Sequence, residues 1–81
     1  MKVIVKLFAA ARDLAGRAEL AVEVPSGAHV GQLRTAILAR APQLKPVVDR
    51  SLVAINAEYA DNTITIGESD EIALIPPVSG G

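Results

Sequence analysis

Hydrophobic and polar positions alternate in two segments near the start of the chain, residues 2–8 and 18–24. A period of two residues is typical of a strand with one buried face, so both segments are predicted to be strands. Lysines on the polar face of the first segment match glutamates on the polar face of the second. This favours an antiparallel pair with opposite charges across it. The charged positions are Lys2, Lys6, Glu19 and Glu23.

The second half of the chain contains three shorter apolar segments. Residues 52–56 form an apolar run that suits a buried strand, and residues 72–75 alternate between two apolar faces. Residues 64–66 are predicted to be a short strand between two turns, at 57–63 and 67–71. The last strand has Ile72 and Leu74 on one face and Ala73 and Ile75 on the other.

Apolar residues recur at helical spacing between residues 29 and 42. We expect one amphipathic helix here, and Pro42 ends it because the residue before a proline is pushed out of the α region. An alanine-rich segment between the first two strands is predicted to form a helical turn that stops at Gly16. The apolar face of the main helix consists of Val30, Leu33, Ile37, Leu38 and Ala41.

The resulting order is strand, strand, helix, strand, short strand, strand. A single amphipathic helix covers only one face of a sheet, so a mixed sheet wrapped around one main helix is predicted. This is the α+β class and the β-grasp, or ubiquitin-like, arrangement. A ferredoxin-like fold would need a second full helix, and residues 45–50 are too short for one. We expect a domain at 1–75 and a flexible tail at 76–81 that protrudes from it.

Composition limits the chemistry of this domain. Its 81 residues have room for one core, and the net charge of −1 comes from interspersed charges of both signs. No basic patch suits nucleic acid, and no apolar stretch approaches the roughly 18 residues of a membrane-spanning helix. Cysteine is absent, which excludes disulfides and thiolate chemistry. With no signal-peptide pattern at the start, we expect a cytoplasmic protein that binds neither nucleic acid nor a membrane.

The side chains do not form a recognisable catalytic set. His29 is the only histidine, and its place before the helix favours a helix-start or surface residue over a general base. The acidic residues near the last turns lack the spacing of a calcium loop, and no glycine-rich phosphate loop occurs. We therefore predict no bound metal, no bound cofactor and no enzyme activity for the chain alone. The acids concerned are Asp61, Glu68, Asp70 and Glu71.

The ending PPVSGG is the most informative segment. Pro76 and Pro77 favour an extended chain, and six residues at about 3.3 Å each span about 20 Å. Gly80 and Gly81 have no side chains, so a narrow channel in a partner would admit them. A frayed end or a cloning remnant would also account for such an ending. If the tail is functional, its reactive group is the α-carboxylate of Gly81, which another protein must activate because the chain has no ATP site.

Three segments carry a resemblance to a known family: VKLFAAARDLAG, VAINAEYA and DEIALIPPVSGG. Together they span nearly the whole chain, which resembles the MoaD/ThiS family of ubiquitin-like sulfur carriers. The residues from Phe8 to Gly16 and the PPVSGG ending favour the molybdopterin synthase branch. A terminal Gly-Gly alone is shared with thiamine-type carriers, Urm-type carriers and ubiquitin.

The resemblance implies a function for the tail. In the family, the terminal glycine, here Gly81, is adenylated by a MoeB-like, E1-like enzyme that uses ATP and Mg²⁺. Sulfur from a cysteine desulfurase or rhodanese-type donor then gives a C-terminal thiocarboxylate. The carrier docks on a MoaE-like large subunit in a heterotetrameric synthase and donates sulfur to cyclic pyranopterin monophosphate. The threading segment would be Pro76, Pro77, Val78, Ser79 and Gly80.

A partner surface is also expected at the root of the tail. If the first and last strands are neighbours, as the β-grasp fold implies, Ile4, Phe8 and Ile75 form an apolar patch on the face opposite the helix. Scattered apolar surface residues are the plainer interpretation. By resemblance, Tyr59 matches a hydrophobic family position. Arg12 matches a family arginine that would meet the adenylating enzyme, although a solvated arginine is as good an interpretation.

The chain departs from the family pattern in two places. Members often carry aromatic residues where this chain has Leu74 and Ile75, which would retune the partner interface. His29 stands where a threonine is common, which we interpret as a difference in helix capping.

Two other functions remain open. A sulfur carrier for thiamine thiazole formation or tRNA thiolation would form the same thiocarboxylate but meet a different acceptor. A ubiquitin-like interaction or conjugation module would instead form isopeptide bonds to lysines, or act with an unmodified tail.

Overall fold

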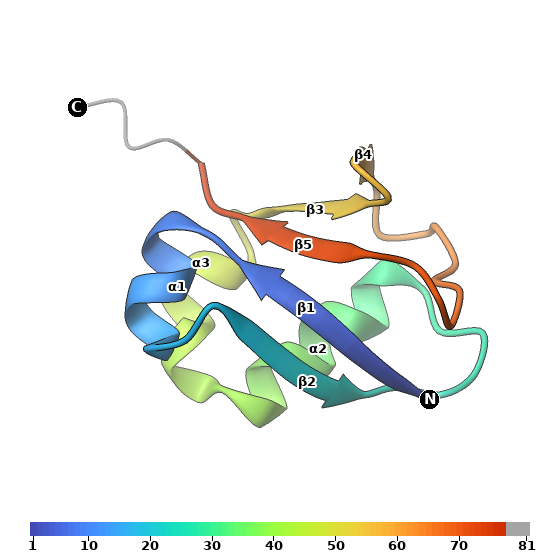
Figure 1. Ribbon diagram of the computed structural model, residues 1–81, viewed down its shortest axis with the longest axis horizontal. Coiled ribbons are helices and arrows are strands. Elements are labelled where there is room, and N and C mark those ends of the chain that lie inside the picture. Colours follow the sequence, from blue (N-terminus) through green and yellow to red (C-terminus); the bar gives the residue numbers. More distant parts are fainter. Residues whose placement is uncertain (78–81) are drawn as a thin grey trace.

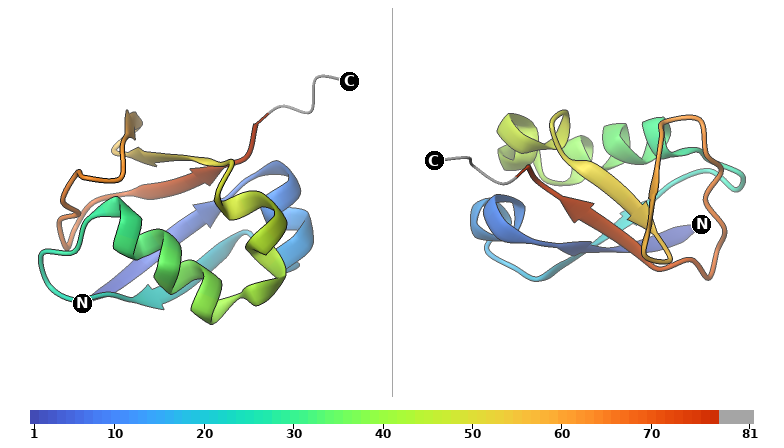
Figure 2. Two further views of the ribbon diagram at one scale, coloured as in Figure 1. Left: turned by 180° about the vertical axis from the view of Figure 1, so that it is seen from behind. Right: turned by 90° about the horizontal axis from the view of Figure 1, so that it is seen from above.

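The chain folds into a five-stranded sheet with the order β2-β1-β5-β3-β4 (Figure 1). This computed structural model describes residues 1–77. Helices lie against one face of the sheet, and the other face is uncovered within this part of the chain (Figure 2). The strands are β1 (Lys2–Leu7), β2 (Glu19–Glu23), β3 (Leu52–Ile55), β4 (Glu58–Ala60) and β5 (Ile72–Ile75).

The first and last strands are parallel neighbours in the middle of the sheet, where Val5 pairs with Ile72. All other pairings, β1 with β2, β3 with β5 and β3 with β4, are antiparallel. The predicted mixed sheet of the β-grasp fold is therefore confirmed. The predicted charge register is also present, since Lys2 lies opposite Glu23 and Lys6 opposite Glu19.

The main helix, α2 (Val30–Arg40), covers the sheet as predicted. Its apolar face and the inward positions of the strands form one hydrophobic core. A shorter helix, α1 (Ala9–Ala15), follows β1 and ends at Gly16, whose φ of 71° is left-handed and suits glycine. The largest fully buried side chains are Val5, Val30, Leu33, Ile37, Leu44, Val48, Val53, Ile66, Ile72 and Leu74.

The first backbone amides of α2 find hydrogen-bond acceptors in two ways. His29 is the N-cap, and its Nδ1 accepts a hydrogen bond from the Gln32 amide at 3.3 Å, while the Gln32 side chain accepts one from the His29 amide at 3.1 Å. The carbonyl groups of Asn62 and Ile64 accept from the next amides of the helix. The interpretation of His29 as a helix-start residue is confirmed, and its chemistry here is that of a capping box.

The strand predicted at residues 64–66 is wrong. This segment forms a single bridge, between Thr65 and His29, because its backbone is used to hold the start of α2. The short strand is instead β4, inside the segment predicted to be a turn. Asn56 and Ala57 take φ values of 51° and 70°, the left-handed pair that closes a two-residue hairpin between β3 and β4.

Two short helical pieces follow α2 and were not predicted: η1 (Pro42–Leu44) and α3 (Lys45–Val48). Neither supplies the second full helix of a ferredoxin-like fold. The Arg34 guanidinium on α2 fixes their end, because Nη1 donates to the carbonyl oxygens of Val48 at 2.6 Å and Ser51 at 2.8 Å. Its Nε donates to Asn62 at 2.8 Å. Nothing in the residue pattern indicated this role for Arg34.

The described part of the chain ends two residues after β5. Pro76 is buried and Pro77 is exposed, so the packed part of the chain extends at least one residue past β5. Val78, Ser79, Gly80 and Gly81 lie outside the described residues. No helix within residues 1–77 has the length and apolar character needed to cross a membrane.

Candidate functional site

A hollow of about 320 Å³ lies on the uncovered face of the sheet and runs along β5, from Glu71 just before the strand to Ile75 at the end from which the tail leaves. It draws side chains from β1, β3, β4 and β5, so the whole central part of the sheet contributes to it. Three of its lining residues, Phe8, Tyr59 and Ile75, were named from the sequence as an expected partner surface. The full lining is Lys6, Phe8, Ala54, Ala57, Tyr59, Glu71, Ala73 and Ile75.

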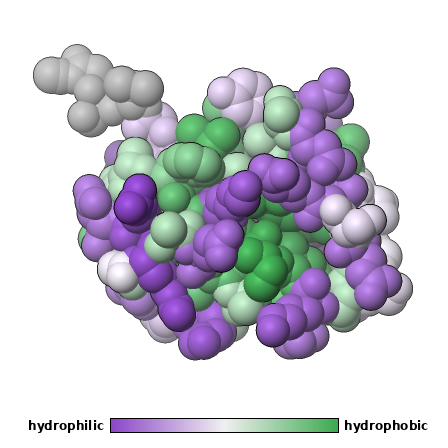
Figure 3. All heavy atoms as spheres, in the orientation of Figure 1, coloured by the Kyte–Doolittle hydropathy of each residue, from purple (hydrophilic) through white to green (hydrophobic). Residues whose placement is uncertain are grey.

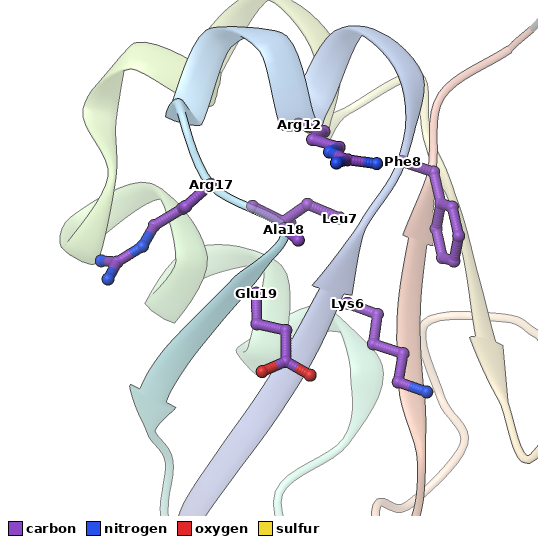
Figure 4. A pocket seen from close by; sticks show the side chains of 7 residues that line it. All are labelled: Lys6, Leu7, Phe8, Arg12, Arg17, Ala18 and Glu19. Carbon is purple, nitrogen blue, oxygen red and sulfur yellow. The ribbon is translucent and has the colours of Figure 1, made fainter.

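The backbone after β1 places Phe8 at this hollow. Phe8 continues the extended conformation of β1, with φ of −127° and ψ of 157°. Ala9 then takes a φ of 49°, which turns the chain sharply into α1. The Phe8 ring is therefore left on the sheet face, 46% exposed, and lies over β5 in Figure 4.

Two other residues of the predicted surface lie elsewhere. Ile4 is 44% exposed on the same face but does not line the hollow. Lys6 comes between it and Phe8 along β1, and Figure 3 shows hydrophilic side chains separating the hydrophobic area at the root of the tail from a second one on this face. Arg12 lies on α1 and borders a neighbouring cleft.

That neighbouring cleft has a volume of about 560 Å³ and lies between β1 and the turn from α1 to β2. It carries three cations and one carboxylate, but Figure 4 shows that their charged ends diverge. Arg17 in particular points away from Arg12 and Lys6. This arrangement gives no single point at which an anionic ligand would be held. The lining residues are Lys6, Leu7, Phe8, Arg12, Arg17, Ala18 and Glu19.

One exposed apolar residue near the tail was missed. Leu52 is 49% exposed and is the register partner of Ile75, so both lie on the uncovered face. An all-apolar run such as residues 52–55 gives no alternation from which its outward positions can be identified. Only the pairing of β3 with β5 distinguishes the outward Leu52 from the fully buried Val53.

An ion pair forms one wall of the hollow. Nζ of Lys6 lies 2.9 Å from Oε1 of Glu71, across the β1–β5 pair. The hydrogen bond and charge of Glu71 raise the pKa of Lys6, and Glu19 contributes less. The cation thus bonds to Glu71, although the residue opposite it on β2 is Glu19.

Asp61 bonds within its own turn, whereas Asp70 bonds both within its turn and to the β3–β4 hairpin. Asp61 accepts hydrogen bonds from the amide and hydroxyl of Thr63, which lower the pKa of its carboxyl group. Asp70 accepts from the Gly67 amide at 2.7 Å and from Asn56 Nδ2 at 2.9 Å. Within residues 1–77, no group of three histidine or acidic side chains is arranged to hold a metal ion.

Comparison with known families gives one match that covers nearly the whole chain. The profile of the ThiS family matches residues 5–81. The chain belongs to the ThiS family. The match includes Gly80 and Gly81, so the ending is part of the family segment, which speaks against a cloning remnant.

Curated relatives share about a third of their aligned residues with this chain. The molybdopterin synthase sulfur carrier subunit of Arabidopsis thaliana is 35% identical, over all of this chain and 84% of its own length. The subunit of the same name from Chlamydomonas reinhardtii is 37% identical, and the whole of both chains is covered. The resemblance to the MoaD-type branch is confirmed.

Solved structures of similar proteins have the same fold. SAMP1 of Haloferax volcanii, a small archaeal modifier protein, is 34% identical with a TM-score of 0.87, and all of both chains is covered. Subunit 1 or 2 of the molybdopterin-converting factor from Helicobacter pylori, solved as a protein–protein complex of the two, is 27% identical. Its TM-score is 0.69, again over all of both chains.

Proposed function

We propose that this chain is the sulfur carrier subunit of a molybdopterin synthase, with the C-terminal carboxylate of Gly81 as its reactive group. The observation that carries this proposal is the family match that runs through Gly81, together with relatives named for that role. The hollow at the root of the tail supports it, because a protein that receives the tail must also cover this face.

The proposed chemistry starts from a poor electrophile. A free carboxylate would have to expel oxide or hydroxide, so an adenylating enzyme first joins the Gly81 carboxylate to AMP from ATP, with Mg²⁺, and releases pyrophosphate. The terminal sulfur of a persulfide on the donor protein then attacks the acyl carbon and displaces AMP, which gives an acyl disulfide. A thiol reductant cleaves the S–S bond of that acyl disulfide, so the thiocarboxylate leaves and the thiol is oxidised to a disulfide. Transfer of that sulfur to the pterin substrate, with a water oxygen taken in return, regenerates the carboxylate. Catalytic side chains belong to the partners, and this chain is not an enzyme alone.

Three partners follow from this proposal. They are a large subunit of the MoaE type, an E1-like adenylating enzyme of the MoeB type, and a sulfur donor of the cysteine desulfurase or rhodanese type. The Helicobacter pylori complex of subunits 1 and 2 supports the first of them by similarity. A cytoplasmic location stays a prediction.

Intact mass spectrometry tests the proposal. The purified chain is incubated with ATP, Mg²⁺, the adenylating enzyme of its host, a persulfide sulfur donor and a thiol reductant. We expect a mass gain equal to the difference between sulfur and oxygen, localised to the last peptide. An enzyme that is active on another carrier but leaves this mass unchanged would contradict the proposal. Transfer to cyclic pyranopterin monophosphate, and not to a thiazole or tRNA acceptor, distinguishes the synthase from the other sulfur pathways.

A second candidate is a protein modifier that forms isopeptide bonds with lysines. Similarity to a small archaeal modifier protein, at 34% identity over the whole chain, favours it. This function would give a ladder of conjugates in host lysates, detected with a tagged chain and lost on removal of Gly81. A thiocarboxylate without such a ladder would leave the sulfur carrier as the function.

A further inference from the structure

The hollow at the root of the tail has a floor of small residues. Ala54 on β3 is 5% exposed and Ala73 on β5 is half-buried, and the two are register partners across the β3–β5 ladder. Larger side chains stand around them: Phe8 at 46% exposure, Tyr59 at 69% and Ile75 half-buried. The depth of the hollow therefore depends on two methyl groups.

The charged wall of the hollow is already paired. Lys6 and Glu71 bond to each other at 2.9 Å, and the Glu71 amide bonds to Asn56 Oδ1 at 2.9 Å. A charged occupant would have to break this ion pair or lie beside it without a counterion. A polar small molecule would need polar groups aimed at it, and the two charged groups of the lining are bonded to each other. The lining favours an uncharged, apolar occupant.

The position of the tail identifies the source of that occupant. The packed domain reaches Pro76, and the five residues from Pro77 to Gly81 span at most about 17 Å. A protein that encloses the Gly81 carboxylate must therefore lie close to the end of β5, and its surface covers the hollow beside it. An apolar side chain seated at the centre of such an interface, with aromatic residues around it, is the arrangement that contributes most to affinity.

We infer that this hollow is a socket for one uncharged apolar side chain of the large subunit, and that Ala54 and Ala73 are the residues that make room for it. The inference rests on the proposed function and names the kind of contact by which the large subunit recognises this carrier. It also assigns a role to two alanines that have little exposed surface of their own.

A pair of matched alanine substitutions tests the socket. Ala73→Leu fills the hollow from its floor. Ala21→Leu adds the same atoms to a half-buried position on the same face, on β2, where Ala21 lies opposite Ile4 and outside the hollow. Binding of the large subunit from the same host is measured by isothermal titration calorimetry for both variants and the unaltered chain, with thermal unfolding of each as a check on folding.

We expect Ala73→Leu to weaken binding by roughly tenfold or more, as for a central contact, and Ala21→Leu to leave it unchanged, with both variants folded. Equal binding by the Ala73→Leu and Ala21→Leu variants would overturn the socket while the mass test of sulfur loading still stands. If Ala73→Leu failed to fold, Ala73→Val, which adds fewer atoms, would be compared with Ala21→Val by the same criterion.

An unaltered chain that gains sulfur but does not bind the large subunit would overturn both the synthase assignment and the socket. Self-association that Ala73→Leu abolishes would assign the hollow to a second copy and overturn the inference.

Discussion

Asn56 and Glu71 bond to each other through both backbone and side chain. The Asn56 amide donates to the Glu71 carbonyl at 2.8 Å, and the Glu71 amide donates to Asn56 Oδ1 at 2.9 Å. Asn56 is also the first left-handed residue of the β3–β4 hairpin, so one residue both turns the chain and holds the start of β5. The carboxylate of Glu71 is thereby fixed beside Lys6, at the edge of the hollow.

Replacing Asn56 with alanine should lower the free energy of unfolding by about 1–2 kcal/mol, because the Glu71 amide loses its acceptor and alanine tolerates positive φ less well. Urea denaturation followed by circular dichroism measures this change. Gln43→Ala is the matched control, since Gln43 is exposed and has no side-chain hydrogen bond in residues 1–77. Equal stability of the two variants would show that the Asn56–Glu71 bonds do not stabilise the fold.

Ala57→Gly should stabilise the domain by about 1 kcal/mol. Ala57 has a φ of 70°, a conformation that costs an L-residue about this much and glycine almost nothing. Ala10→Gly should instead destabilise the domain, since Ala10 is an exposed residue of α1 and glycine in a helix lowers the free energy of unfolding by about 1 kcal/mol. A loss of stability in both variants on urea denaturation would contradict the assignment of strain to the hairpin.

The Lys6–Glu71 pair should stabilise the fold only up to alkaline pH. Glu71 raises the pKa of Lys6 in the folded chain above the ordinary value of 10.5. The ion pair therefore stabilises the fold fully at pH values below 10.5, and this stabilisation is lost as pH rises through the higher pKa of the folded chain. The melting temperature of the unaltered chain should therefore exceed that of Glu71→Gln by a small amount at pH 9, and the difference should vanish above the folded pKa. Because both side chains are exposed, added salt should also reduce the difference. A difference that grows with pH would contradict this assignment.

Phe8→Asp should weaken binding of the large subunit strongly while the domain stays folded, because the exposed ring lies at the rim of the hollow and outside the core. Leu14→Asp is a useful control, since Leu14 is similarly exposed, at 43%, but lies on α1 and does not line the hollow. The measurement is calorimetric titration with the large subunit. Unchanged affinity of the Phe8 variant would remove this face from the interface.

Deletion of Gly81, or replacement of Gly80 by tryptophan, should abolish sulfur transfer with little change in melting temperature. The terminal carboxylate is the proposed reactive group, and a bulky residue before it would not pass a narrow channel. Sulfur transfer is assayed as molybdopterin formation with the large subunit, and Ser69→Ala, in an exposed turn, serves as the control. A large fall in melting temperature on deletion would mean that the tail belongs to the folded domain.

Much of the fold followed from alternation and helical spacing. β1, β2 and α2 each have one apolar face with a clear period, so their patterns predicted both the elements and the side that faces the core. The pattern of β5 predicted the strand, but both of its faces are apolar. The error at residues 64–66 arose because three apolar or β-branched residues suit a strand, while their backbone is used by the start of α2. β4 was missed since Asn56-Ala57 lacks the glycine that usually signals a two-residue hairpin.

The candidate site was predictable only where large side chains are involved. Phe8, Tyr59 and Ile75 are conspicuous in a chain with two aromatic residues, and they do line one hollow. Leu52, Ala54 and Ala73 were not named as site residues, because their importance depends on which strands are neighbours. The bond between Lys6 and Glu71 was missed for the same reason, since it depends on the parallel pairing that places the first strand beside the last.

The parallel pairing of β1 and β5 has a mechanical consequence. The tail continues from a central strand with β1 on one side and β3 on the other, and the N-terminus lies at the far end of the molecule (Figure 1). Tension applied to the chain beyond Ile75 acts along β5 and loads the hydrogen bonds on both of its sides together, in shear. Peeling them one at a time would need a force across the strand. A partner that draws the tail into a channel can therefore pull on it without stripping the last strand from the sheet.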